Sequence, residues 1–301
     1  MDFNTIRSYL RDKKIEFAEN EPMRNHTTFK IGGNADFFVT PTEETQIIKL
    51  NEFCLSNNIR ITVLGNGSNI LVADDGIDGI VLSLSKYNGI TVNGSTVTAK
   101  SGAKLSAVCN KALKYSLSGL EFAYGIPASV GGALFMNAGA YGGETADVVQ
   151  SATVLFNNKV TVISAKDMCL GYRHSIFKDG NYIILSVDFL LMPGNKIDIK
   201  NKMDDLISRR REKQPLEYGS AGSTFKRPKG NYAAALIDQS GLKGYSVGDA
   251  QVSSKHAGFV VNTGNAKCSD VLKVIEDVKR TVKQKTGYEL EPEVIYLGRS
   301  D

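Results

Sequence analysis

Hydrophobic positions near the N-terminus recur at helical and then at strand spacing. Phe3, Ile6 and Leu10 follow the spacing of an amphipathic helix. The run 35–40 (ADFFVT) predicts a strand, and Pro41 with the residues after it predicts the start of a second helix. The side chains that this helix is expected to bury are Ile47, Leu50, Cys54 and Leu55.

Short β-rich runs dominate the middle of the chain. Strands are predicted over 61–64, 70–72 and 80–84. The run 151–163 predicts a hairpin that turns at Asn157-Asn158, because asparagine tolerates the positive φ of such a turn. A further strand is expected over 182–192, and it ends at Pro193-Gly194-Asn195.

The last third alternates helices with short strands. Apolar spacing predicts one helix after residue 195 and a second that Ser269 caps and Gly287 ends, with a strand over 258–262 between them. We therefore expect an α+β region here. The turn before residue 195 is the expected domain boundary, which gives domains 1–194 and 195–301.

Composition and charge exclude several classes of protein. The 301 residues are 42% hydrophobic and 23% charged, which is ordinary for a globular protein of more than one domain. The net charge is +4 and the only basic run is Arg209-Arg210-Arg211, which disfavours a nucleic-acid arm and suits anionic small molecules. Neither a signal peptide nor a membrane span is evident, so a cytoplasmic location is expected. Four scattered cysteines and three isolated histidines predict buried thiols and no metal site.

Glycine is unusually frequent in the composition, with 29 residues. The loop Gly65-Asn66-Gly67-Ser68-Asn69 follows a predicted strand. Its glycines would let main-chain N–H groups approach a diphosphate, although an ordinary turn fits the same residues. The loop lacks the lysine of a Walker loop. It also has Ile70 where the Rossmann fingerprint needs glycine, so both of those phosphate loops are excluded.

A second cluster places seven glycines between residues 119 and 144. So many residues without side chains indicate a flat or extended ligand against the backbone, with Ser129, Asn137 and Tyr141 available to hydrogen-bond it.

Five motifs then occur in order between about residues 22 and 298: GNGSN, GIPASVGGALFMNAGAYGGE, GYRHS, AGSTFKRP and LEPEV. Together they resemble the UDP-N-acetylenolpyruvoylglucosamine reductase (MurB) family of peptidoglycan synthesis. The chain resembles the shorter subclass, because Tyr172-Arg173 is followed almost at once by the strand at 182, which leaves no room for an inserted tyrosine loop.

The resemblance implies an FAD-binding fold of the vanillyl-alcohol-oxidase (PCMH) type. That fold would occupy 1–194 in two subdomains, about 1–58 and 59–194. The α+β substrate-binding domain would be 195–301, with its last strand returning to the flavin region. The implied cofactor-binding residues are Gly65, Asn66, Gly67, Ser68, Asn69, Gly125, Ile126, Pro127, Ser129, Gly131, Gly132, Asn137, Gly139, Ala140 and Tyr141. Ala128 stands where the family usually has glycine, which would strain the backbone if φ is positive there.

The implied reaction passes hydride from NADPH to FAD, and then to the methylene carbon of an enolpyruvyl ether of UDP-N-acetylglucosamine, to give UDP-N-acetylmuramate. Arg173 would stabilise the enolate-like species, Ser223 would donate the proton and Glu293 would assist Arg173. Without the resemblance, these three residues read as a surface arginine, a loop serine and a solvated carboxylate. The implied substrate contacts are Arg210, Lys213, Lys226, Lys255 and Asn262.

Two other functions stay open at this point. An oxidase of the same fold would act on an alcohol or a sugar, although neither flavin loop offers the His or Cys that often tethers FAD in such enzymes. A nucleotide-sensing module without catalysis would not need the proton donor Ser223. The expected partner is an anionic nucleotide sugar, with no nucleic acid and no membrane insertion, and the expected state is a monomer or weak dimer. His174 is expected to be a bystander and 25–33 to be structural.

Overall fold

The computed structural model describes residues 2–299 and divides into two compact units, each assembled from separate parts of the chain. Unit 1 consists of Met1–Ala18, Phe38–Asn66 and Gly79–Arg210. Unit 2 consists of Glu19–Phe37, Gly67–Asp78 and Arg211–Asp301. The expected domains were continuous segments, whereas these units are discontinuous. Two short N-terminal stretches group with the C-terminal third.

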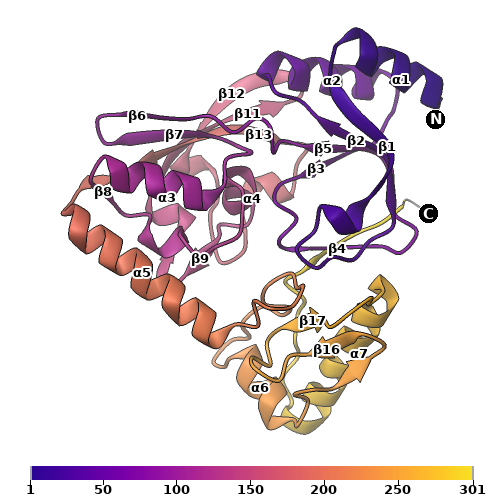
Figure 1. The fold of residues 1–301 in the computed structure, drawn as a ribbon, viewed down its shortest axis with the longest axis vertical. Helices are drawn as coiled ribbons and strands as arrows, with labels where there is room; N and C mark the ends of the chain where they lie inside the picture. The colour runs from indigo at the N-terminus through magenta and orange to yellow at the C-terminus, as the bar shows by residue number, and fades with distance from the viewer. Residues whose placement is uncertain (1, 300–301) are drawn as a thin grey trace. The chain divides into compact units, whose positions relative to one another are not determined.

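Helices and strands are interspersed along the described chain (Figure 1). The helices are α1 (Phe3–Asp12), α2 (Glu44–Ser56), α3 (Leu105–Lys114), α4 (Val130–Phe135), α5 (Lys196–Lys213), α6 (Ala233–Gln239) and α7 (Cys268–Thr286). The strands up to residue 118 are β1 (Glu16–Pro22), β2 (Asn34–Thr40), β3 (Ile61–Leu64), β4 (Ile70–Val72), β5 (Ile77–Ser83), β6 (Ile90–Asn93), β7 (Thr96–Lys100) and β8 (Leu117–Ser118). The later strands are β9 (Gly139–Ala140), β10 (Gly143–Glu144), β11 (Val149–Phe156), β12 (Lys159–Ser164), β13 (Ile183–Leu190), β14 (Met192–Pro193), β15 (Ser246–Val247), β16 (Ala250–Val252), β17 (Val260–Asn262) and β18 (Ile295–Leu297).

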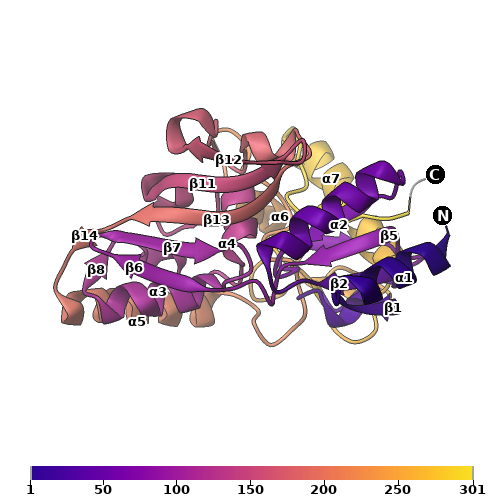
Figure 2. The ribbon, with the colours of Figure 1, turned by 90° about the horizontal axis from the view of Figure 1, so that it is seen from above.

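A five-stranded antiparallel sheet of order β12-β11-β13-β7-β6 forms the centre of unit 1. Figure 2 shows the strands in this order, with β12 at one edge and β6 at the other. The hairpin β11–β12 turns at Asn157 (φ 47°) and Asn158 (φ 59°), which confirms the predicted turn and its positive φ values. A second sheet has the order β1-β2-β5-β3, in which β3 and β5 are parallel.

The core of unit 1 lies between the five-stranded sheet and the helices α3 and α4. Val108 of α3, Leu134 of α4 and Val187 of β13 are completely buried in one hydrophobic cluster. On α2, the expected stripe is confirmed at Ile47, Leu50 and Cys54, but Leu55 is 60% exposed. The prediction for Leu55 was wrong because the next residue after Cys54 lies about 100° further around the helix, outside the narrow buried stripe.

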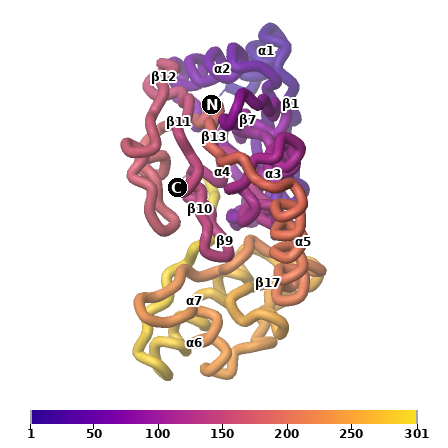
Figure 3. Tube along the Cα trace, turned by 90° about the vertical axis from the view of Figure 1, so that its left-hand side faces the viewer, coloured from indigo at the N-terminus to yellow at the C-terminus, as the bar shows by residue number. Residues whose placement is uncertain are grey.

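Unit 2 packs α7 against the three-stranded sheet β15-β16-β17. Helix α6 lies beside α7 (Figure 3). Val271, Val278 and Val282 of α7 are completely buried at helical spacing, as the sequence pattern predicts, and Val274 is buried with them. Leu272, which the same pattern also placed in the stripe, is 41% exposed. Gly287 ends the helix in the left-handed conformation (φ 77°), which confirms the predicted stop. The last strand, β18, pairs in parallel with β4.

Asp74 caps α7, and Ser269 does not. The helix begins at Cys268, and the Asp74 carboxylate accepts hydrogen bonds from the main-chain N–H groups of Cys268 (2.7 Å) and Ser269 (3.0 Å). Burial raises the pKa of the Asp74 carboxyl, but these two donors, together with the Ser269 side chain and the charge of Lys267, outweigh it and hold the pKa below its usual value. The predicted cap was wrong because the capping group comes from 195 positions earlier in the chain.

Replacing Asp74 with alanine is expected to lower the stability of unit 2 by about 1 kcal/mol, the usual loss for a helix cap. Because folding lowers the pKa of Asp74, its ionic contribution is complete above the unfolded-state pKa and is lost as the pH falls through the folded-state pKa. The urea midpoint at pH 7 should therefore drop in Asp74→Ala, and the gap to the wild type should narrow below about pH 4. Asp75→Ala is the matched control. Equal midpoints for the two variants at pH 7 would contradict the assignment.

The structure shows how far the cysteines are buried and whether any helix could span a membrane. Cys54, Cys109 and Cys268 are buried, and burial raises the pKa of each to about 12. Cys169 is exposed, so the expectation of four buried thiols was wrong for this residue. From residue 2 to residue 299, the structure contains no helix that is long and apolar enough to span a bilayer.

Candidate active site

The first half of the predicted diphosphate loop adjoins the second glycine-rich motif within unit 1. The Asn66 side-chain amide donates to the carbonyl oxygen of Pro127 at 2.7 Å. A Cβ on Gly65 would lie 2.6 Å from the Ser129 Oγ, so a larger residue here would displace the Ser129 hydroxyl. The structure therefore brings together two motifs that lie about sixty residues apart.

The second half of the loop belongs to unit 2, where neighbouring main-chain atoms leave no room for a side chain at Gly67. Gly67 has a φ of 61°, and a Cβ there would lie 2.0 Å from the carbonyl oxygen of His26. The Gly67 carbonyl accepts a hydrogen bond from Thr28 N at 3.0 Å. The Asn69 amide donates to the carbonyl oxygen of Glu293 at 3.2 Å, and the Asn69 carbonyl accepts from Ile295 N at 2.9 Å.

The main-chain donors of this loop point to an anion. Within the described part of the chain, the N–H groups from Gly65 to Asn69 have no hydrogen-bond acceptor. Consecutive free main-chain donors around a glycine with positive φ form the concave donor arrangement that binds phosphate groups. This observation favours the phosphate loop over the ordinary turn that the sequence also allowed.

Residues 25–33, expected from the sequence to be structural, connect the loop to the serine motif. Thr28 accepts a hydrogen bond from Ser220 N (3.1 Å), and its Oγ1 donates to the Ser220 carbonyl (2.6 Å). Thr28 also binds Gly67 through its main chain. Residue types give little sign of this role, because most of these contacts are made by the main chain.

Ser223 and Glu293 lie on neighbouring extended segments in unit 2. Glu293 N donates to the Thr224 carbonyl at 2.8 Å, and Phe225 and Pro292 form an antiparallel bridge. Among the described residues, the half-buried Ser223 hydroxyl has no hydrogen-bond partner. The structure thus brings together two predicted catalytic residues that are 70 positions apart and leaves the hydroxyl available.

Arg173 occupies a tight turn in unit 1. Gly171 and His174 exchange main-chain hydrogen bonds of 3.1 Å, and Arg173 between them has a φ of 55°. The guanidinium lies 5.0 Å from the centroid of the Tyr172 ring, and Lys178 Nζ donates to the Arg173 carbonyl at 3.2 Å. The turn therefore presents Arg173 from a backbone conformation that non-glycine residues rarely adopt.

The glycine-rich segment ends in the two-residue hairpin β9–β10, which is visible in Figure 3. Tyr141 (φ 55°) and Gly142 (φ 86°) form its turn, and the Tyr141 side chain is 45% exposed. At the start of the same segment, Ser129 caps α4 by accepting a hydrogen bond from Gly132 N at 3.3 Å. Ala128 is not among the described residues with positive φ, so the alanine causes no strain of that kind.

Arg210 on α5 faces the start of this segment. Its Cδ lies 3.2 Å from the position of a Cβ on Gly125. Burial lowers the pKa of the guanidinium and the nearby Tyr141 opposes that shift, but an arginine side chain remains charged. In the described part of the chain, the guanidinium has neither an ion-pair nor a hydrogen-bond partner. A half-buried cation of this kind is suited to an anionic ligand.

The other predicted substrate contacts differ in how far their side chains are already engaged. Lys213 is exposed. Lys226 pairs with Glu291, and Lys255 Nζ donates to the Arg211 carbonyl at 2.9 Å. The Asn262 side chain donates to the carbonyls of Phe29 and Lys30 and accepts from the N–H groups of Gly264 and Ala266. Asn262 has thus used its hydrogen-bonding capacity inside unit 2.

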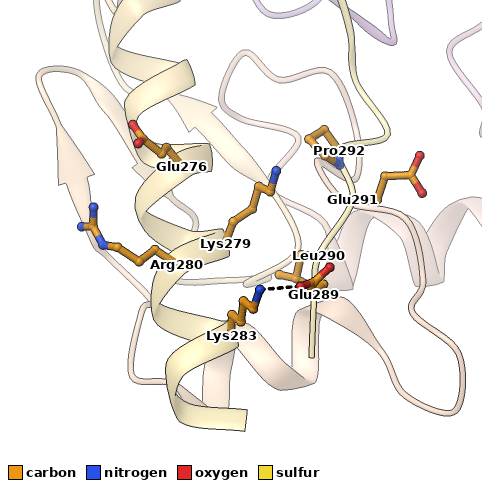
Figure 4. Close-up of a pocket in the computed structure, with 8 residues that line it drawn as sticks. All are labelled: Glu276, Lys279, Arg280, Lys283, Glu289, Leu290, Glu291 and Pro292. Atoms are coloured by element: carbon orange, nitrogen blue, oxygen red, sulfur yellow. Dashed lines mark ion pairs between the residues drawn. The ribbon is translucent and has the colours of Figure 1, made fainter. Parts of the chain in front are cut away.

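A cleft of about 690 Å³ lies along α7, outside the predicted site. Figure 4 shows Lys279 and Lys283 facing it, together with the ion pair between Lys283 and Glu289. Glu291 and Pro292 line it, whereas the predicted catalytic and binding residues are not among its lining residues. Among residues 2–299, no group of His, Cys, Asp and Glu could hold a metal ion.

Comparisons with known proteins agree with this geometry. A model of the FAD binding domain matches residues 35–165, and a model of the C-terminal domain of UDP-N-acetylenolpyruvoylglucosamine reductase matches residues 214–297. The UDP-N-acetylenolpyruvoylglucosamine reductase of Clostridium novyi (strain NT) is 52% identical over 299 residues, which cover 99% of this chain and 97% of that protein. The reductase of the same name from Caldanaerobacter subterraneus is 47% identical over 97% of each chain.

A solved structure extends the match to the fold. The crystal structure of UDP-N-acetylenolpyruvylglucosamine reductase (MurB) from Thermus caldophilus has a TM-score of 0.81 and 33% identity, and the match covers 94% of this chain and 98% of that one. The expected fold class, an FAD-binding region followed by an α+β C-terminal domain, is confirmed. The chain belongs to the UDP-N-acetylenolpyruvoylglucosamine reductase family.

Proposed function

We propose that the protein reduces the enolpyruvyl ether of UDP-N-acetylglucosamine to UDP-N-acetylmuramate in peptidoglycan synthesis, with FAD as cofactor and NADPH as hydride donor. One observation carries this proposal: the chain matches the family over nearly its whole length, and Arg173, Ser223 and Glu293 stand in the family's motifs. The free hydroxyl of Ser223 beside the Glu293 segment supports it.

The residues present fit FAD. The free N–H groups of 65–69 would hold the diphosphate, and glycines 65 and 67 leave space that side chains would fill. The segment 125–141 would lie along the rest of the cofactor, with Arg210 at its start. FAD, when bound, supplies the centre that takes hydride from NADPH and passes it to the substrate.

The chain's own residues would then stabilise the negative charge that forms on the substrate and supply the proton. Arg173 would bind the substrate carboxylate, because a planar guanidinium stabilises the negative charge that develops there after hydride addition. Glu293 would assist it, and the Ser223 hydroxyl would give its proton to the adjacent carbon. Lys226 is engaged with Glu291 in this structure, which leaves Arg210 and Lys213 as the cations for the nucleotide diphosphate.

An absorbance spectrum tests the function directly. The purified protein is expected to be yellow, to lose its colour when NADPH is added without oxygen, and to regain it when the enolpyruvyl nucleotide follows. Rapid recovery of the colour with oxygen alone, and none with the nucleotide, would indicate an oxidase. A folded protein that stays colourless after incubation with FAD would exclude both. The cytoplasmic location and the state of monomer or weak dimer remain predictions.

A further inference from the structure

Asn137 is buried in the glycine-rich segment, and both ends of its side-chain amide are hydrogen-bonded. The residue is 0% exposed and has a φ of 43°. Its Nδ2 donates to the carbonyl oxygen of Gly171 at 2.9 Å, and its Oδ1 accepts from Ala146 N at 2.9 Å. An amide engaged in this way is not directed at a ligand, although Asn137 stands in a motif expected to bind flavin.

The carbonyl that Asn137 holds belongs to the turn that carries Arg173. Gly171 O also accepts from His174 N at 3.1 Å. The asparagine therefore binds the same carbonyl oxygen that closes this turn. Arg173 has a φ of 55°, which costs on the order of 1 kcal/mol in a non-glycine residue. Contacts from outside the turn are needed to hold it in that conformation.

The far end of the turn is fixed to the same stretch of chain. Ser175 is completely buried, and its Oγ donates to the carbonyl of Phe135 at 2.7 Å. Phe135 ends α4, two residues before Asn137. Residues 135 and 137 therefore hold the two ends of the turn, at 175 and 171, through two side-chain hydrogen bonds.

We propose that Asn137 is a positioning residue for Arg173, which fixes the guanidinium relative to the flavin-binding segment. The inference rests on the proposed role of Arg173. Asparagine suits this task because it tolerates positive φ and offers a donor and an acceptor together. A displacement of about 1 Å at a reacting group can lower the rate about a hundredfold, so the contact matters for the chemistry as well as for the fold.

Asn137→Asp tests the proposal with almost no change in shape. The carboxylate keeps the acceptor for Ala146 N but loses the donor to Gly171 and places a negative charge against that carbonyl. We expect full flavin content and normal reduction by NADPH. We expect reoxidation by the enolpyruvyl nucleotide to slow by roughly tenfold to a hundredfold, in kcat rather than KM.

The double variant separates positioning from a structural role. In an Arg173→Ala background, Asn137→Asp should change the second half-reaction by less than about twofold, because residues that act through one another are not additive. Full additivity, or an equal loss in the NADPH half-reaction, would overturn the proposal. Arg173→Ala with a normal second half-reaction would instead overturn the proposed role of Arg173.

Two further variants keep the result interpretable. Asn157→Asp changes another asparagine with positive φ, in the exposed β11–β12 turn, and should leave both half-reactions unchanged. Asn137→Gly keeps the backbone conformation and removes both hydrogen bonds, so it should reproduce the kinetic defect if the aspartate variant fails to fold. If neither variant binds flavin, Asn137 is required for the fold and the proposal is wrong.

Discussion

Ser223→Ala is expected to leave flavin reduction by NADPH intact and to slow reduction of the enolpyruvyl nucleotide by roughly 10²-fold to 10⁴-fold, the usual contribution of a general acid. The hydroxyl has no partner among the described residues, so its removal breaks no hydrogen bond of the fold and takes away only the proposed proton donor. Anaerobic stopped-flow absorbance measures the two half-reactions separately.

Ser220→Ala is the matched control for this variant. Ser220 lies three residues earlier in the same segment and binds Thr28 through its main-chain N–H and carbonyl, which alanine keeps. It should retain both half-reactions. If Ser223→Ala and Ser220→Ala reoxidise the flavin equally fast, another group donates the proton.

Gly67→Ala is expected to weaken flavin binding strongly, with a rise of roughly a hundredfold or more in the FAD dissociation constant, which corresponds to about 2.7 kcal/mol. A Cβ at this position would lie 2.0 Å from the His26 carbonyl, and the φ of 61° disfavours any side chain. The loop must therefore move and take its free N–H groups with it. Fluorescence titration of the apoprotein with FAD measures the change.

Gly94→Ala separates the clash from the backbone strain. Gly94 has a φ of 56°, but a Cβ there meets nothing within 4 Å. This variant should bind FAD normally and lose only about 1 kcal/mol of stability. Normal FAD affinity in a folded Gly67→Ala protein would show that the loop does not hold the diphosphate.

Local signals in the sequence were sufficient where a structure depends on neighbouring residues. The turn at Asn157-Asn158, the buried stripe of α7 and its stop at Gly287 follow from spacing and from residues that tolerate positive φ. The glycines at 65 and 67 likewise indicated the loop, because neighbouring groups lie where their side chains would be.

Contacts between distant parts of the chain could not be predicted in this way. Asp74 caps a helix that begins near residue 268, and Thr28 binds both Gly67 and Ser220. The amide of Asn137 was expected to face a ligand but binds a carbonyl 34 positions away. Each of these contacts depends on which segments the fold brings together, and neither spacing nor residue type shows that.

The discontinuity of unit 2 also constrains the order in which the protein can fold during synthesis. Phe29, Ile31 and Leu71 are buried in one cluster with residues of α6 and α7. The ribosome makes these three residues early, but most of their apolar neighbours come after residue 220. Until the C-terminal third emerges, they have no completed core to enter, so the nascent chain exposes apolar surface for most of its translation. The contacts of this cluster are of high sequence separation, which predicts that unit 2 forms slowly.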